Sequence, residues 1–282
     1  MRSGRSRIVV FMFPSYRYLE AVNNVRILSG LSVTANRYGY RLIVVAFEKG
    51  QDYKTAFSSI IIERKIDGIF AIFNAPKPDA IMQKFVREQS VPFVFVNSNR
   101  MEDDLYCVGS NNTEGVRQAC EHLIEKGRRR ILFLGKYTTS LIAMERLSGY
   151  RMALKSAGLS YRREVKLPDM TGESEYGAST VAGLLLQKNR PDAIICYDDH
   201  VAMGALKAAL KTGVKVPDEL AVIGFGGIYE GAFTLPALTT VYEDGYEIGK
   251  TAMELMVSIL QKQRPEKVKV KIPTTLLVRD SV

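Results

Sequence analysis

The sequence predicts an α/β fold built from parallel sheets, and three observations support that class. Short, continuous runs of Val, Ile and Phe alternate with longer amphipathic stretches along most of the chain. The short runs lack polar alternation, as is typical of strands that are buried on both faces. Glycine recurs where an amphipathic stretch gives way to the next apolar run, at Gly39, Gly127, Gly158 and Gly213.

The apolar runs have the length of strands. "RIVVFMF" and "PFVFVN" fall in the first third of the chain, and "RILFLG" and "LAVIGF" belong to a second set. A run of 4–8 apolar residues rich in Val, Ile and Phe favours a buried strand over a helix. The expected strands are 7–13, 42–47, 67–73, 92–97, 130–135, 191–197 and 220–225.

The amphipathic stretches have the length of helices. In "VAMGALKAALKTG", Val201, Ala205, Ala208 and Ala209 recur at the spacing of one helix face. Strands that alternate with such helices imply right-handed crossovers within parallel sheets. The expected helices are 112–126, 144–157, 175–188, 199–212 and 244–262.

Seven or more strand–helix units are too many for one small doubly wound sheet. They would form either a single barrel or two lobes. The stretch "CVGSNNTEGV" at 107–116 places Gly, Ser and Asn before a new helix, which fits a crossing between lobes. Periodicity alone leaves both architectures open.

Composition indicates an ordinary globular protein, with 46% hydrophobic and 24% charged residues in 282. The apolar runs are far shorter than the roughly 20 residues of a membrane helix. The six apolar residues after "MRSGRSR" are too few for a signal-peptide core. We therefore expect a cytoplasmic protein.

The cysteines and histidines argue against a disulfide framework or a metal centre. Cys107, Cys120 and Cys196 are odd in number and far apart, which favours buried or idle thiols in a reducing compartment. His122 and His200 are the only histidines, so a histidine-rich zinc site is not expected. Neither a metal nor a cofactor is predicted.

The net charge of +9 raises the question of an anionic partner. Part of the excess lies in "RSGRSR" at the start, "KGRRR" at 126–130 and "KVKVK" at 267–271. For the last two, solvated charge on a surface turn and on an edge strand is the favoured interpretation.

The glycine-rich stretch "VIGFGGIYEG" at 222–231 is a candidate ligand turn. A dinucleotide fingerprint would need a third glycine at position 229, which is Tyr229, and no ribose-binding acid follows a next strand. The GK[ST] ending of a phosphate loop is also absent. A turn at the carboxyl end of a strand remains, and open α/β sheets place ligands there.

Two charged motifs each allow two interpretations. Within "CYDDHVAMGAL", Asp198 would bind a ligand hydroxyl while Asp199 caps the helix, or both would only cap it. A metal site formed by these residues and His200 lacks a second cluster of ligands.

Arg146, in "AMERLSGYRMAL", stands at the start of a helix. It would either grip a polar ligand or pair on the surface with Glu145 or Glu173. Catalysis is not expected, because the chain has neither a GxSxG elbow nor a recognisable triad spacing. Asp103 and Asp104 lie in a polar loop, where solvation explains them.

Four segments together resemble the lactose-repressor/galactose-repressor (LacI/GalR) family of transcriptional regulators. They are "HLIEKGRRRILFLG", "RLSGYRMALKSAGL", "RPDAIICYDDHVAMGALKAALKTGVKVPDELAVIGF" and "PALTTVYEDGYEIGKTAMELM". The resemblance runs from about residue 5 to the end and is strongest after 110. It implies a type I periplasmic-binding-protein-like fold: two doubly wound parallel-sheet lobes, three crossovers, and a ligand in the cleft between them.

The resemblance also implies the domain boundaries. "GRSR" at 4–7 is similar to the stretch that joins the family's DNA-reading headpiece to its core. We expect the core of a longer repressor with its helix-turn-helix headpiece absent, although a natural relative without a headpiece is the alternative. The expected parts are a linker remnant at 1–7, an N-terminal lobe of 8–110 plus 242–271, and a C-terminal lobe of 111–241 plus 272–282.

The family's ligand site carries over residue by residue. Arg146 matches the arginine that binds ligand hydroxyls, Asp198 a position where Asn is common, and Asn97 one where Asp is frequent. Gly226 replaces a sugar-gripping aspartate, and Met170 replaces an aromatic residue that stacks on the sugar. Tyr16 or Tyr18 would supply the missing aromatic face. The predicted ligand-binding residues are Arg146, Asp198, Asn97, Gly226, Met170, Tyr16, Glu243 and Ser140.

These replacements make a common hexose less certain and admit a nucleoside, a polyol or an acidic metabolite. The resemblance implies a homodimeric core in which a sugar or related small polar effector shifts the population of states and so changes affinity for operator DNA. The alternatives are a binding protein for transport or chemoreception and a sugar-processing enzyme. Arg146→Ala is expected to abolish effector binding and leave the fold intact.

Overall fold

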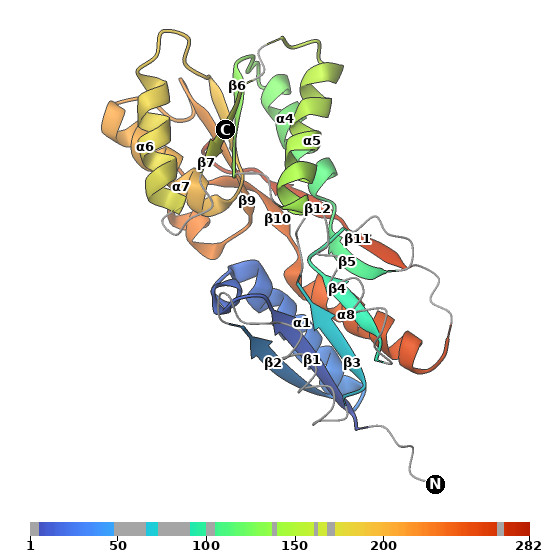
Figure 1. Ribbon diagram of the computed structural model, residues 1–282. Coiled ribbons are helices and arrows are strands. Elements are labelled where there is room, and N and C mark those ends of the chain that lie inside the picture. Colours follow the sequence, from blue (N-terminus) through green and yellow to red (C-terminus); the bar gives the residue numbers. More distant parts are fainter. Residues whose placement is uncertain are drawn as a thin grey trace. The chain divides into compact units, whose positions relative to one another are not determined.

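The computed structural model describes residues 6–47, 66–72, 91–99, 105–136, 140–160, 163–167, 173–263 and 268–282. The chain forms two compact units, each with its own sheet (Figure 1). The first comprises Met1–Ser110 and Asp244–Ile272, and the second comprises Asn111–Glu243 and Pro273–Val282. Three passages of the chain therefore join the units, and the single-barrel alternative is wrong.

The first unit is built on a parallel sheet in the order β11-β5-β4-β3-β1-β2 within the described residues. Its described helices are α1 (Val22–Arg37), α8 (Gly245–Leu260) and the short 3-10 helix η1 (Tyr16–Leu19). The strands are β1 (Ile8–Phe13), β2 (Arg41–Ala46), β3 (Gly68–Ala71), β4 (Phe93–Val96), β5 (Tyr106–Ser110) and β11 (Lys269–Ile272).

The second unit has a sheet in the order β12-β10-β9-β8-β6-β7, parallel except for β12, which runs antiparallel to β10. Its strands are β6 (Ile131–Lys136), β7 (Arg163–Leu167), β8 (Ala193–Cys196), β9 (Ala221–Gly226), β10 (Thr239–Glu243) and β12 (Thr274–Leu277). Its helices are α4 (Asn112–Glu125), α5 (Leu141–Ser156), α6 (Glu173–Leu185), α7 (Asp199–Thr212) and the 3-10 helix η2 (Tyr229–Phe233).

Both faces of the second sheet are covered, as the uninterrupted apolar runs predict. Successive side chains of a strand point to opposite faces. Leu132 and Leu134 pack with α6 and α7, whereas Ile131 and Phe133 pack with α4 and α5. Figure 1 shows the two helix pairs on opposite sides of this sheet. A strand buried on both faces cannot carry polar alternation, which is why β6, β8 and β9 read as solid apolar runs.

Glycines bring paired helices into close contact. A Cβ atom on Gly30 of α1 would lie 2.1 Å from the Tyr246 carbonyl oxygen of α8, and one on Gly249 of α8 would lie 2.1 Å from the Ile27 carbonyl oxygen of α1. In the second unit, Gly204 of α7 approaches the Ser174 carbonyl of α6 in the same way. Any larger residue would force these helices apart.

The expected elements are largely confirmed, and the misses have one cause. Every expected strand and helix coincides with an observed one to within a few residues. The strands that the apolar pattern missed are short and contain charged, hydroxyl or glycine residues: β5, β7, β10 and β12. In the stretch 107–116, residues up to Ser110 complete β5, so the irregular connection there is only one residue long before α4 begins.

Local signals at helix ends and along the chain agree with the structure. Gly39, Gly127, Gly158 and Gly213 all have positive φ, between 66° and 85°, as the helix-end interpretation predicts.

"KVKVK" contributes to β11, an edge strand of the first sheet. Within the described ranges, each helix is too short or too polar to serve as a transmembrane segment.

Candidate functional site

The Arg146 side chain is buried in the second unit and hydrogen-bonded through all three of its nitrogens. Arg146 is 4% exposed. Its Nε donates to Asn112 Oδ1 over 3.0 Å, one terminal nitrogen donates to the Tyr197 carbonyl over 2.6 Å, and the other donates to Glu243 Oε2 over 3.1 Å. A buried guanidinium needs such acceptors and a counter-charge, because a buried lone cation is costly.

Two aromatic rings complete the surroundings of Arg146. Its Cζ lies 3.6 Å from the ring centroid of Phe225 and 4.9 Å from that of Tyr197. Both distances fall within the range of cation–π attraction. The guanidinium is therefore held in one orientation by rings as well as by hydrogen bonds.

These residues converge because several parallel strands end at the same edge of the second sheet. Tyr197 follows β8, Phe225 lies at the end of β9, Glu243 ends β10, and α5, which carries Arg146, follows β6. We call this the carboxyl edge of the second sheet. Ligands of open α/β sheets bind at such edges.

The surface interpretation of Arg146 is wrong. Its ion-pair partner is Glu243, and the side chains of both are 5% exposed. The neighbouring Glu145 accepts a hydrogen bond from Asn112 Nδ2 over 3.0 Å instead. Glu173 begins α6, and its side chain lies outside the described part of the chain. Asn112 thus joins Arg146 to Glu145, a link that sequence spacing did not suggest.

The two neighbouring aspartates have different partners in the structure, and the capping by Asp198 matches one of the two interpretations. Asp198, not Asp199, caps α7, since its Oδ1 accepts from the Val201 N–H over 2.9 Å. Asp199 is buried, and its Oδ2 accepts from the Ile228 N–H over 2.8 Å while its Oδ1 accepts from the Thr240 hydroxyl over 2.6 Å. Neither the ligand-binding nor the pure-capping interpretation anticipated this bridge.

Asp199 supports the glycine-rich turn that follows β9. Gly226 and Gly227 have φ values of 124° and 67°, which only glycine adopts without strain. The Gly227 N–H donates to the Thr240 hydroxyl, which in turn donates to Asp199. Burial raises the pKa of Asp199 above its ordinary value, and the hydrogen bonds from Thr240 and from the turn oppose that shift.

Two predicted site residues lie in the first unit. Asn97 follows β4 with a φ of 52°, and its Nδ2 donates to Asn24 Oδ1 of α1 over 3.3 Å. Its Oδ1 is buried and has no hydrogen-bond partner within the described part of the chain. Tyr16 begins η1, just after β1, with 55% of its surface exposed, and Tyr18 in the same turn is 39% exposed.

Of the remaining predicted residues, Ser140 is the N-cap of α5, six residues before Arg146, and its side chain makes no capping hydrogen bond. Met170 lies outside the described residues. Arg146, Asp198, Gly226 and Glu243 do gather at the carboxyl edge of the second sheet. That Ser140, Asn97, Tyr16 and these four bind a ligand stays a prediction.

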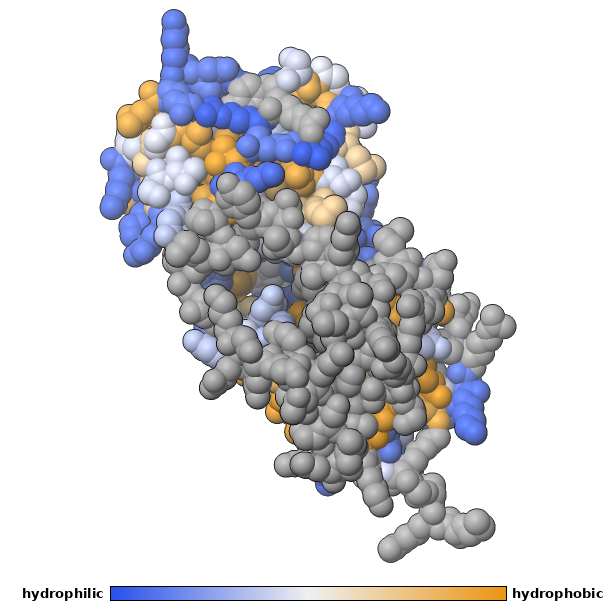
Figure 2. Space-filling view, in the orientation of Figure 1, coloured by the Kyte–Doolittle hydropathy of each residue, from blue (hydrophilic) through white to orange (hydrophobic). Residues whose placement is uncertain are grey.

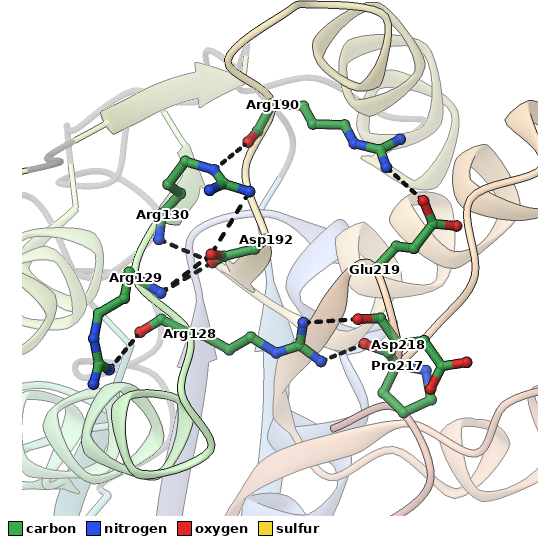
Figure 3. Close-up of polar contacts among 8 residues, drawn as sticks. All are labelled: Arg128, Arg129, Arg130, Arg190, Asp192, Pro217, Asp218 and Glu219. Atoms are coloured by element: carbon green, nitrogen blue, oxygen red, sulfur yellow. Dashed lines mark hydrogen bonds and ion pairs between the residues drawn. The ribbon is translucent and has the colours of Figure 1, made fainter.

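The basic stretch at 126–130 lies at the opposite, amino edge of the same sheet and is hydrogen-bonded to neighbouring loops (Figure 3). The Arg128 side chain donates to the carbonyls of Pro217 and Asp218, and the backbone N–H groups of Arg129 and Arg130 donate to the Asp192 carboxylate.

Arg130 and Arg190 extend this amino-edge cluster. Arg130 Nε donates to the Arg190 carbonyl over 3.0 Å, and Arg190 pairs with Glu219 over 2.6 Å. These arginines lie before β6 and β8 and join the loops that enter β6, β8 and β9. Figure 2 shows hydrophilic side chains interspersed with hydrophobic ones on the surface of the second unit. "KGRRR" is thus a largely exposed surface turn, as predicted, in which the Arg128 and Arg130 side chains also bond to neighbouring loops.

The residues that sequence reasoning missed are Asn112, Tyr197, Phe225 and Thr240. Phe225 and Tyr197 end apolar runs and resemble ordinary core residues, while Asn112 and Thr240 resemble helix-start and strand residues. Their position at the ends of strands of one sheet was the available signal. Among the described residues, His, Cys, Asp and Glu side chains form no group of three that could hold a metal ion.

The fold and this edge define a periplasmic-binding-protein-like ligand-binding domain. Residues 120–282 match the family model described as "Periplasmic binding protein-like domain". The chain is 31% identical over 238 residues to the HTH-type transcriptional repressor CytR of Escherichia coli K12, covering 84% of this chain and 69% of that relative. It is 29% identical to the HTH-type transcriptional repressor PurR of Erwinia tasmaniensis, covering 93% and 77%.

The chain belongs to the LacI family of transcriptional regulators and is its effector-binding core. A LacI-family regulatory protein from Chloroflexus aggregans has a similar structure, with a TM-score of 0.86, 27% identity and 98% coverage of both chains. A transcriptional regulator CelR–cellobiose complex shares the fold at 23% identity and a TM-score of 0.85, covering 100% of this chain and 86% of that one. The similar proteins are regulators rather than enzymes.

Proposed function

We propose that this core binds a small polar effector, a sugar or related metabolite, at the carboxyl edge of the second sheet. The observation that carries the proposal is the buried Arg146 guanidinium, held by Asn112, Glu243 and the Tyr197 carbonyl. Two of its five N–H groups are not used in these contacts. A rigidly held polar group at this edge of an α/β sheet is the usual basis of ligand recognition.

Effector binding then changes the affinity of the regulator for operator DNA by population shift. A ligand that favours one of two states changes the DNA affinity only through its differential affinity for those states. Operator DNA must change effector affinity by the same factor. The similarity to HTH-type transcriptional repressors supports this role. We infer a cytoplasmic homodimer, because helix-turn-helix regulators read paired half-sites.

A ligand screen tests the proposal on the chain itself. Thermal-shift measurements with neutral sugars, nucleosides and small acids identify a binder, and calorimetry then gives its Kd. The site variant is Arg146→Met with Glu243→Met, which removes both charges together and so leaves no buried charge unpaired. We expect this double variant to unfold cooperatively and to lose effector binding.

The matched control removes an ion pair from the other edge of the same sheet. Arg190 and Glu219 pair over 2.6 Å in the amino-edge cluster of Figure 3. Arg190→Met with Glu219→Met should bind the effector with unchanged affinity. Equal binding by the wild type and the Arg146–Glu243 double variant would remove these residues from the site. Fused to the headpiece of a LacI-family relative, the core should bind operator DNA in an effector-dependent way.

The alternative, a binding protein for transport or chemoreception, predicts effector binding without any effect on DNA affinity in that fusion. The same experiment therefore separates the two functions. Conversion of a bound ligand to product, followed by chromatography, would instead support a sugar-processing enzyme.

A further inference from the structure

The Glu243 carboxylate is only half satisfied. Its Oε2 accepts from Arg146, whereas its Oε1 is buried and has no hydrogen-bond partner among the described residues. The residue is 4% exposed. A buried carboxylate oxygen without a donor is costly, so it marks a position where a donor from another molecule would be strongly favoured.

Three further polar groups of this edge are hydrogen-bond acceptors, and each of them already has a donor. Asn112 and the Tyr197 carbonyl already accept from Arg146, and Asp198 already accepts at the start of α7. Apart from the two unused N–H groups of Arg146, the unsatisfied buried group at this edge is the acceptor Glu243 Oε1, which calls for a hydroxyl or N–H donor from the ligand.

The charge of the edge points the same way. Three carboxylates, those of Asp198, Asp199 and Glu243, lie close to the ends of β8 and β10, and the Arg146 guanidinium is paired with one of them. An anionic group placed beside Glu243 would meet a like charge in a poorly solvated site, where electrostatic interactions are strong. Arg146 is thus not free to act as an anion clamp.

Resting on the proposed function of this edge, we infer that Glu243 is the specificity-determining residue for the effector. Its free oxygen accepts a hydroxyl or amine proton from the ligand, and its charge excludes anionic ligands. The effector is then an uncharged or cationic molecule rich in donors. Glu243 would therefore reject acidic metabolites, which the sequence alone admits, and also phosphorylated sugars.

Matched ligand pairs test this assignment on the wild-type chain. Calorimetry compares D-glucose with D-gluconate, D-ribose with D-ribose 5-phosphate, and adenosine with adenosine 5′-monophosphate. For any pair that binds, we expect the neutral member to bind at least about tenfold more tightly, as a charge-assisted hydrogen bond requires. An anionic member that binds as tightly as its neutral partner would overturn the role of Glu243 and leave the proposed site standing.

A single substitution provides the second arm. Glu243→Gln keeps the shape of the side chain but removes its charge, so the preference for the neutral ligand should fall about tenfold or more. Glu247→Gln is the control, because Glu247 lies in α8, partly exposed, and pairs with Lys250. It should preserve the preference. Thermal melting checks that both variants fold.

The remaining outcomes separate a failure of the role of Glu243 from a failure of the proposed function. An unchanged preference in a folded Glu243→Gln variant refutes the assignment, while continued binding of a neutral ligand keeps the proposed function. If Glu243→Gln unfolds, calorimetry of the matched ligand pairs on the wild-type chain alone decides whether Glu243 has this role. If no member of any pair binds the wild-type chain, both the proposed function and the role of Glu243 lose their support.

Discussion

The hydroxyl of Thr240 donates a hydrogen bond of 2.6 Å to the carboxylate of Asp199, 41 residues earlier in the chain. The same carboxylate accepts from the Ile228 N–H. One buried side chain therefore connects the start of α7, the glycine turn after β9, and β10. This bridge fixes the turn at the carboxyl edge of the second sheet.

The pKa of Asp199 makes this bridge sensitive to pH. Burial raises the pKa above its ordinary value of 3.8, so the folded state holds the proton more tightly than the unfolded state. Stability from this group is full below pH 3.8 and declines as the pH rises through the folded-state pKa. Relative to Asp199→Asn, which cannot titrate, the wild type should lose free energy of unfolding as the pH rises above this value.

Urea unfolding of both proteins at several pH values between about 4 and 7 measures that difference. His200→Gln serves as a control for the exposed side chain next to Asp199 in the chain. A stability difference between the wild type and Asp199→Asn that is constant, or that grows in favour of the wild type as the pH rises, would contradict the prediction.

Removal of Arg146 should destabilise the fold, contrary to the expectation drawn from the sequence. Arg146→Ala leaves the buried Glu243 carboxylate without its counter-charge and leaves Asn112 without its donor. Breaking a buried ion pair from one side costs about 3–5 kcal/mol. Urea unfolding should show a loss of that size. Adding Glu243→Ala should recover part of it, whereas simple additivity of the two substitutions would show that the pair is not coupled.

Restoring an aspartate at position 226 should not restore a sugar handle. Gly226 has a φ of 124°, and a Cβ atom there would lie 3.6 Å from Asp199 Oδ2. Gly226→Asp therefore combines backbone strain of about 1–3 kcal/mol with repulsion from a second carboxylate. Gly226→Ala carries the strain alone and is the matched control. Thermal melting should rank the wild type above Ala and Ala above Asp, and equal stability of the two variants would exclude the repulsion.

The three thiols should be unreactive in the native protein. Cys107, Cys120 and Cys196 are free and buried. Burial raises the pKa of Cys120 and of Cys196, and the thiolate is the reactive form. Ellman's reagent at pH 8 should therefore react more than about a hundredfold more slowly with the native chain than with chain unfolded in guanidinium chloride. Rapid reaction of any one thiol in the native chain would show that its site opens readily.

Much of the fold follows from local sequence patterns. The buried strands of the second sheet are uninterrupted apolar runs because both faces of that sheet are covered. Gly213 ends α7 with a φ of 72° because glycine tolerates that backbone without strain. Strands such as β7 and β10 were not predicted, because their charged and hydroxyl residues break the apolar pattern.

The sequence predicted the candidate site only in part. Arg146 and Glu243 were identified through family resemblance, but their direct pairing over 97 residues of chain was not. The buried contacts of Asp199 with Ile228 and Thr240 were equally hidden, because Asp198 and Asp199 are both good capping residues. The sequence by itself determined the elements and the residue types at their ends. Only the tertiary structure decided which side chains meet, because strand order in the sheet brings the ends of β8, β9 and β10 together.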